Sequence, residues 1–428
     1  MALDKVTTGV IADDAVTSAK IPADAVGTTE IANDASISTS GNIATTGSGT
    51  LTVAGIATAP SLILSPGSAP GSPAEGQVYY NSTTNQFRMY RAGKWWVFNG
   101  KIDDEDNLPA TGGDITYYAD GSTDYVVHTF RTCGRFILDT NKTCDILLVG
   151  GGGGGATGNN SSSSSGDAAG GGGAGMVVWA SQKALVADTY EVGIADGGWK
   201  GTNYYHGPSA NQRGFVGSPS RFGDNVYEAG GGGYGAIANN NGGGGSSPWG
   251  GSGGGAGGGG NGPTGGPTDG GNVNTGGTEY VNRGGNNASG LGAPYGGSGG
   301  GGAGGQGIDL TTSNNGSGTA GGNGINSATN MTTAQWRAFL DCADVGVRHG
   351  DHRYIAGGGG GGGGDGGSDS NVGGLGGHGG GGKGGSGSGN TPATNGAANT
   401  GGGGGGGGTR RFEAGAGGTG VCVVRYAL

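Results

Sequence analysis

The distribution of glycine constrains the fold more than any other feature of this chain. Of its 116 glycines, twelve lie in the first 112 residues and the other 104 lie in the remaining 316. Average glycine usage is about 7%. Uninterrupted runs fill residues 150–155, 357–364 and 401–408, and no strict Gly-X-Y period exists. The absence of this period excludes a collagen triple helix, and the composition predicts a domain boundary near residue 112.

Two structures compete for a region so rich in glycine. Glycine-rich chains are usually flexible coils, but here the runs are separated by non-repetitive segments that carry Trp, Tyr and charged residues. The sequence therefore favours an ordered lattice of polyglycine II helices, which are extended and have three residues per turn. Only glycine lets such helices pack closely on all sides, because any Cβ would strike a neighbouring backbone.

The first 35 residues repeat with a period of ten. Each unit has only two large apolar residues, so it must stack on copies of itself or on other chains. The repeat predicts a fibrous stalk that self-associates as a homotrimer, and a disordered tail is the alternative. The aligned residues are Val6, Val16 and Val26, then Ile11, Ile21 and Ile31, and then Asp14, Asp24 and Asp34.

A small aromatic β-meander follows the stalk. Prolines punctuate residues 66–73, and three short aromatic segments then occupy 77–81, 86–90 and 95–98, with turn residues between them. This spacing is typical of three antiparallel strands. We therefore expect a repetitive attachment and stalk region at 1–60, a meander with its linker at 61–112, and a glycine-rich domain at 113–428.

Two hydrophobic strands enclose the glycine-rich domain. Residues 144–149 run directly into the first glycine run, and residues 420–426 form a matching strand at the far end. We expect these strands to share one sheet in a mainly β, sandwich-like domain. Further strands are expected as a pair on either side of Gly134 within 129–138, and at 176–179, 184–187 and 189–194. One helix is predicted at 332–344, where Thr332 is the N-cap and Trp336, Phe339 and Leu340 have helical spacing. It covers a face of the lattice or docks a partner.

The net charge of the chain argues against nucleic acid as a partner. The net charge is −10 and the pI about 4.8, so phosphate backbones would repel the chain and nucleic acid is not an expected partner. No secretory leader or membrane-spanning segment is expected.

The chain has four cysteines, and no two of them form a CxxC motif. This spacing favours free thiols over a disulfide framework. Cys133 and Cys144 are the one pair close enough in sequence to bridge a hairpin.

Residues 1–100 resemble modules of bacteriophage tail fibres, especially those of phages with aquatic hosts. The resemblance rests on the decapeptides and on the meander sequence GSPAEGQVYYNSTTNQFRMYRAGKWWVF. Residues 120–428 resemble a glycine-rich domain of phage fibres, which a strand like LLVGGGGGG opens and a strand like VVRY closes. The resemblance implies a virion protein made in the host cytoplasm and joined to other virion proteins through residues 1–60.

In fibre tips of this kind, a polyglycine lattice presents loops that adsorb to a bacterial surface glycan or protein. The corresponding segments here are 199–208, 246–249, 277–295 and 332–355. Exposed aromatic rings suit the faces of sugars. The alternative role for these rings is to cap the lattice without contacting a receptor. The alternative role for the whole protein is a purely structural capsid or collar fibre. The candidate receptor-binding residues are Trp199, Tyr204, Tyr205, Trp249, Tyr280 and Tyr295.

The sequence offers no convincing catalytic or cofactor site. Its acidic residues are scattered, without the pair of carboxylates that a polysaccharide depolymerase requires, so we do not expect an enzyme, and a depolymerase is the least favoured alternative. Matches to G-x-G-x-x-G occur throughout and carry no information. His349, Asp351 and His352 are weak candidates for a metal site, because two histidines and one carboxylate without further ligands are more typical of a polar loop. No cofactor is expected.

Overall fold

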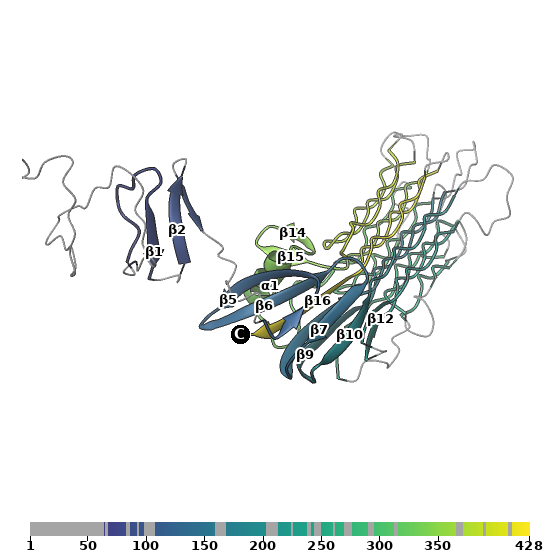
Figure 1. The fold of residues 1–428 in the computed structure, drawn as a ribbon. Helices are drawn as coiled ribbons and strands as arrows, with labels where there is room; N and C mark the ends of the chain where they lie inside the picture. Colours follow the sequence, from purple (N-terminus) through teal and green to yellow (C-terminus); the bar gives the residue numbers. More distant parts are fainter. Residues whose placement is uncertain are drawn as a thin grey trace, which may run out of the picture. The chain divides into compact units, whose positions relative to one another are not determined.

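A computed structural model gives two compact units, Met1–Asn99 and Gly100–Leu428 (Figure 1). The predicted decapeptide stalk at 1–60 lies outside the described residues. The structure describes residues 64, 67–82, 86–91, 94–97, 108–158, 168–202, 213–223, 226–237, 241–243, 250–259, 262–268, 276–289, 295–311, 316–364, 371–387, 391–409 and 413–428.

The first unit contains the predicted meander. Three antiparallel strands pair in the order β1-β2-β3. The ring of Tyr79 is buried and meets Trp95 edge-on, with 4.6 Å between ring centroids. The aromatic residues therefore give this small sheet a face to bury, as the sequence predicted. The strands are β1 (Val78–Asn81), β2 (Gln86–Arg91) and β3 (Lys94–Val97).

The second unit is built on two antiparallel sheets. The five-stranded sheet has the order β12-β11-β10-β7-β4, and the six-stranded sheet has the order β13-β9-β8-β16-β6-β5. The chain is thus mainly β, as expected. The first sheet contains β4 (Ala110–Thr111), β7 (Gly134–Leu138), β10 (Asp188–Gly193), β11 (Ser220–Phe222) and β12 (Tyr227–Ala229). The second contains β5 (Asp114–Asp120), β6 (Thr123–Phe130), β8 (Lys142–Val149), β9 (Val177–Leu185), β13 (Thr278–Tyr280) and β16 (Val421–Ala427).

The two strands that enclose the glycine-rich region are neighbours in one sheet. β8 pairs with β16 in antiparallel register, with Val149 opposite Val421. Residues 146–149 and 421–424 are buried throughout, so both faces of these strands are covered. This explains why each reads as a continuous apolar run instead of alternating with polar residues. The prediction that the two ends share a sheet is confirmed.

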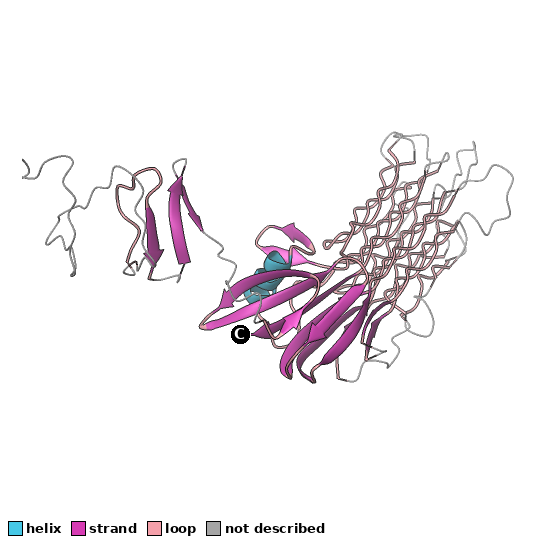
Figure 2. Cartoon of the chain, in the orientation of Figure 1, coloured by secondary structure: helices cyan, strands magenta, loops and turns pink. Residues whose placement is uncertain are grey.

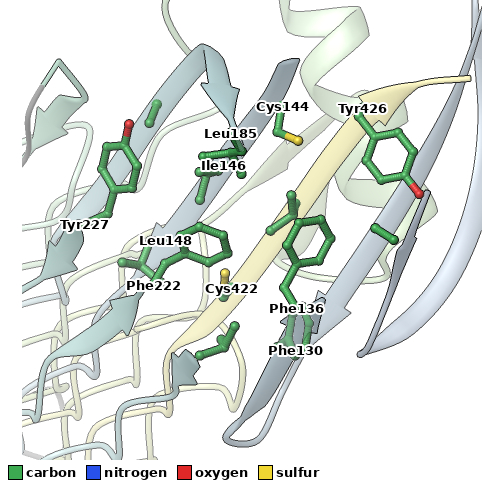
Figure 3. Close-up of a cluster of buried hydrophobic side chains, with 14 of the residues drawn as sticks. Phe130, Phe136, Cys144, Ile146, Leu148, Leu185, Phe222, Tyr227, Cys422 and Tyr426 are labelled. Atoms are coloured by element: carbon green, nitrogen blue, oxygen red, sulfur yellow. The ribbon is translucent and has the colours of Figure 1, made fainter. Parts of the chain in front are cut away.

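An aromatic core lies between the two sheets (Figure 3). Side chains of β7 and β11 from the five-stranded sheet meet side chains of β8 and β16 from the six-stranded sheet. Phe136 and Phe222 are fully buried, with 6.1 Å between their ring centroids. Burying an aromatic or large aliphatic side chain stabilises the fold by about 1.5–3 kcal/mol, so this core holds the two sheets together.

A second core covers the opposite face of the six-stranded sheet. The helix α1 (Thr333–Ala343) begins at the predicted cap, where Thr332 and Gln335 form a capping box. Trp336 and Phe339 pack on Trp179 of β9, each with ring centroids 5.7 Å away. The predicted helix is confirmed, but it covers a sheet, because its large aromatic face matches the apolar face of β9 and β16. The hairpin β14 (Val347–His349) and β15 (His352–Tyr354) follows it.

A buried ion pair crosses the middle of this sheet. Arg425 of β16 contacts Asp145 of β8 at 2.7 Å, and both side chains are almost fully buried. The guanidinium also lies 4.6 Å from the ring centroid of Tyr125. Asp145 Oδ1 accepts hydrogen bonds from Ser181 Oγ at 2.9 Å and Gln182 N at 2.7 Å. Because each charge has polar or aromatic partners, its desolvation is offset.

The glycine-rich segments extend from the sandwich as a bundle without strand ladders (Figure 2). Neighbouring segments run both parallel and antiparallel to one another. The hydrogen bonds of these segments explain why no strand ladders form. In residues 150–155, successive N–H groups donate in rotation to three different segments, with N···O distances of 2.8–3.0 Å. The pattern repeats every third residue. The donor–acceptor pairs are Gly150 to Met176, Gly151 to Ser218, Gly152 to Gly418, Gly153 to Gly173, Gly154 to Phe215, and Gly155 to Gly415.

The carbonyl groups of the same segment follow the same rotation. They accept from three further segments, so residues 150–156 exchange hydrogen bonds with six neighbours. Residues 357–364 are surrounded in the same way. The bonds accepted are from Gly232 and Gly235 to Gly151 and Gly154, from Gly198 and Gly201 to Gly152 and Gly155, and from Gly404 and Gly407 to Gly153 and Ala156.

The same period decides where side chains are tolerated. A Cβ added at Gly153, Gly360 or Gly404 would lie 2.0–2.1 Å from a backbone oxygen of a neighbouring segment. By contrast, Val372 and Leu375 are three residues apart and both exposed, while the two glycines between them are buried. In this segment the large apolar residues therefore occur where the chain faces outward.

Replacing a glycine inside the lattice should destabilise the whole unit. In Gly404→Ala the new Cβ would lie 2.1 Å from the oxygen of Gly415, and a backbone atom cannot rotate away. We expect a loss of about 3 kcal/mol or more in unfolding free energy, at the upper end of overpacking. Thermal unfolding measures it. Gly305→Ala is the control, because its Cβ meets nothing closer than 3.7 Å. Equal melting temperatures for the two variants would contradict the prediction.

Acid should weaken the sandwich through His128. This fully buried side chain has Nδ1 2.7 Å from the carbonyl oxygen of Gly112 and Nε2 3.2 Å from the hydroxyl of Tyr426. Burial lowers its pKa below the ordinary 6.5, and the bond to Gly112 opposes this only partly. The unfolded chain thus takes up a proton first as pH falls below 6.5, and stability falls by up to about 1.4 kcal/mol per pH unit.

Denaturant unfolding of the wild type at pH 7.5 and pH 5.5 measures this loss. His128→Gln should show a smaller difference between the two pH values, because glutamine does not titrate. An unchanged pH dependence in His128→Gln would rule out His128 as the source.

Candidate receptor-binding surface

Three of the six candidate aromatic residues lie within the described residues. Trp199 follows β10 in a lattice segment, Tyr280 ends the edge strand β13, and Tyr295 belongs to another lattice segment. They lie on different elements and share no hydrogen bond or ring contact with one another. The structure thus does not gather them into one site. Tyr204, Tyr205 and Trp249 lie outside the described residues.

Trp199 is the most exposed large apolar side chain described, at 80%. Its backbone is fixed in the lattice, because its carbonyl oxygen accepts a hydrogen bond from Phe215 N at 2.9 Å. Phe215 and Val216 on that neighbouring segment are 45% and 40% exposed. We call Trp199, Phe215 and Val216 the Trp199 patch. Lys200, next to Trp199, forms an ion pair with Glu413, so a charged group borders the patch.

Phe215 is a residue that the sequence analysis missed. It lies between the candidate loops, in the short apolar pair Phe215–Val216 of a glycine- and serine-containing segment. Two adjacent apolar residues in such a segment are the only sequence feature that could have indicated Phe215 as a candidate. Only the hydrogen bond between segments shows that it neighbours Trp199.

Tyr280 and Tyr295 are packed more tightly. The Tyr280 ring contacts the core beneath α1, and its hydroxyl accepts a hydrogen bond from Thr329 N at 3.0 Å. The backbone carbonyl of Tyr295 accepts from Ala168 N at 3.0 Å, and its side chain is half-buried. Tyr280 therefore lies on the edge strand of its sheet and packs on the core beneath α1. Tyr280 also lines a groove of about 420 Å³ beside β13.

The histidines of the β14–β15 hairpin form an aromatic cluster. His349 and His352 lie opposite each other in the hairpin. His349 stacks on His378 of a lattice segment, with 3.7 Å between ring centroids, and Tyr354 lies 5.3 Å from His378. Asp351 is exposed, and its backbone carbonyl accepts a hydrogen bond from Arg337. Within the described ranges, no group of three or more His, Cys, Asp or Glu side chains is placed to hold a metal ion.

All four cysteines are free thiols, so Cys133 and Cys144 do not bridge. Cys133 is exposed, and its sulfur accepts a hydrogen bond from Ile194 N at 3.4 Å. Burial raises the pKa of Cys144 to about 12, with a smaller contribution from neighbouring Asp145. Burial also raises the pKa of Cys422. The two buried thiols therefore act as small apolar core residues and not as nucleophiles.

No protein-family model matches this chain, and no curated protein sequence matches it. Within the described residues, no helix is long and apolar enough to cross a bilayer. The fold itself defines a mainly β protein in which a two-sheet sandwich carries a hydrogen-bonded array of glycine-rich segments.

The stacked histidines yield a titration test. Partial burial lowers the pKa of His378 below its ordinary value, and the charge of His349 lowers it further. In His349→Asn the second cause disappears, so the pKa of His378 should rise towards 6.5. Proton NMR titration of the imidazole measures this. His352→Asn is the control, since His352 makes its ring contact with Tyr354. A His378 pKa that moves equally in both variants would contradict the direct effect of His349.

Proposed function

We propose that this chain is a structural fibre protein of a bacterial virus, a tail fibre or fibre tip, that adsorbs to a receptor on the host surface. The single observation that carries the proposal is the threefold rotation of hydrogen bonds through the glycine-rich segments. It accounts for the glycine-rich composition of a region that resembles a domain of phage fibres. In this proposal, residues 1–60 attach the protein to other virion proteins and form a homotrimer.

The hydrogen bonds support polyglycine II helices. A helix of this type has three residues per turn and no internal hydrogen bonds, so each third N–H points in the same direction. The observed donors of residues 150–155 return to the same segment at every third residue. With a rise of about 3.1 Å per residue, the eight residues 357–364 span about 25 Å. Such a bundle forms a rigid support from which outward-facing side chains project.

The Trp199 patch supports adsorption over a purely structural role. A fibre whose only function was support would gain nothing from an indole that is 80% exposed. Tryptophan is enriched among residues that contribute most to binding, because its large rigid surface is desolvated by a partner. A bacterial glycan or surface protein is the proposed partner. Tyr280 and Tyr295, which are both half-buried, support the receptor site less.

Cell adsorption tests the proposal. Fluorescently labelled full-length protein is incubated with a panel of bacterial strains that includes aquatic species. We expect saturable binding to at least one strain, weakened by about tenfold in Trp199→Ala, which corresponds to about 1.4 kcal/mol. Leu375→Ala is the matched control, since Leu375 is a 66% exposed lattice residue on a different segment.

The outcomes separate the two roles. Loss of binding in Trp199→Ala with normal binding in Leu375→Ala supports adsorption through the Trp199 patch. Absence of saturable binding across the panel favours the capsid or collar fibre without receptor binding. Both substituted side chains are mainly exposed, so circular dichroism should show an unchanged fold.

A further inference from the structure

We propose that the groove beside β13 is a binding subsite for a neutral saccharide, separate from the Trp199 patch. The inference rests on the proposed receptor-binding function and names the chemical class that this groove takes. The groove has a volume of about 420 Å³, within the range of about 300–1,000 Å³ that is usual for ligand sites. The residues on which the argument depends are Glu279, Tyr280, Asn282, Ile325, Asn326 and Ser327.

The position of the groove follows from the sheet order. β13 is the last strand of the six-stranded sheet and pairs only with β9. Residues 303–304 and 324–327 of the glycine-rich region line the groove together with residues 279–282. The groove therefore lies where the edge of the sandwich meets the glycine segments, and it contains both an aromatic ring and polar side chains.

The walls of the groove are fixed before any ligand binds. The Tyr280 hydroxyl is held by Thr329 N at 3.0 Å and lies 3.2 Å from Thr329 Oγ1. Asn282 Nδ2 donates to the carbonyl oxygens of Gly302 and Ala303 at 2.9 and 3.0 Å. Ile325 exchanges two backbone hydrogen bonds of 3.1 Å with Ile355. A preorganised site loses less conformational entropy when it binds a ligand.

Two polar side chains in the groove have unused hydrogen-bonding capacity. Asn326 and Ser327 are half-buried, and within the described part of the chain neither side chain makes a hydrogen bond. A carboxamide offers two donors and one acceptor, and a hydroxyl offers one donor and an acceptor. Sugar hydroxyls are also donors and acceptors at once, so they match this set. Tyr280, which is half-buried, also lines the groove.

The charges of the groove exclude other ligand classes. Glu279 is the only charged residue that lines it, and no Lys, Arg or His is present among the described lining residues. A phosphate or an acidic polymer would therefore lack a cationic partner. Hydrolysis of a glycosidic bond usually requires a pair of carboxylates, one on each side of the bond. This groove supplies only one carboxylate, that of Glu279. Binding without cleavage is the activity that the lining residues support.

Saturation-transfer NMR on the full-length protein tests the subsite. The probes are glucose, galactose, mannose, rhamnose and N-acetylglucosamine, with glucose 6-phosphate as the anionic comparison. We expect at least one neutral sugar to bind with a Kd of about 1 mM, which corresponds to about −4 kcal/mol. Asn326→Leu removes the carboxamide at similar size and should weaken binding by about tenfold. Tyr280→Phe keeps the ring and should weaken it less.

Leu375→Ala is the matched control, because its 66% exposed side chain belongs neither to the groove nor to the Trp199 patch. Sugar saturation that stays equal in the wild type and Asn326→Leu would overturn the proposal, as would binding of none of the neutral sugars or stronger binding of glucose 6-phosphate. The proposed function can fail separately. If no cells bind but sugars bind at Asn326, adsorption fails and the subsite stands. If cells bind and Asn326→Leu changes nothing, adsorption stands and the subsite fails.

Discussion

The rest of the structure depends on one steric fact, which is that glycine has no Cβ. Glycines 150–155 can exchange hydrogen bonds with six neighbouring segments only because those backbones approach within hydrogen-bonding distance on every side. A single methyl group at Gly153 would lie 2.0 Å from the oxygen of Gly233. A strand ladder satisfies the backbone in one plane, whereas this arrangement satisfies it in three directions. The apolar side chains buried in the lattice interior are small, as at Ala156 and Ala169, so the hydrophobic contribution to stability is correspondingly small there.

The sandwich supplies that contribution. Ordering each residue costs about 1–2 kcal/mol, while a hydrogen bond returns about 0.5–1.5 kcal/mol net and a Cα–H···O contact about 0.5–1 kcal/mol. The lattice alone is therefore close to balance. Its first segment leaves β8 at Val149 and its last segment enters β16 at Val421, and these residues are paired within a sheet that is buried on both faces. The two cores thus hold the ends of the glycine segments in register.

The same geometry decides where function can be placed. Within the lattice the buried side chains are small or polar, as at Ala169 and Ser298. Large apolar side chains occur where the threefold period points outward, as at Leu375, or at the boundary with the sandwich, as at Tyr280. Trp199 combines a fixed backbone with a free indole. A rigid support with a small number of projecting side chains suits adsorption, because the side chains need little reorganisation when they meet a surface.

The sequence by itself determined the local features. Each local feature is encoded in residues that are neighbours in the chain. Such features are the strands at 144–149 and 420–426, the aromatic meander and the Thr332 cap, and each was predicted. The tertiary structure decided the division into two sheets, the packing of α1 on Trp179 instead of on the lattice, the stack of His349 on His378, the position of Phe215 beside Trp199, and the groove beside β13. These features join residues far apart in the chain, and a repeated glycine run contains no side-chain pattern that specifies which six segments will surround it.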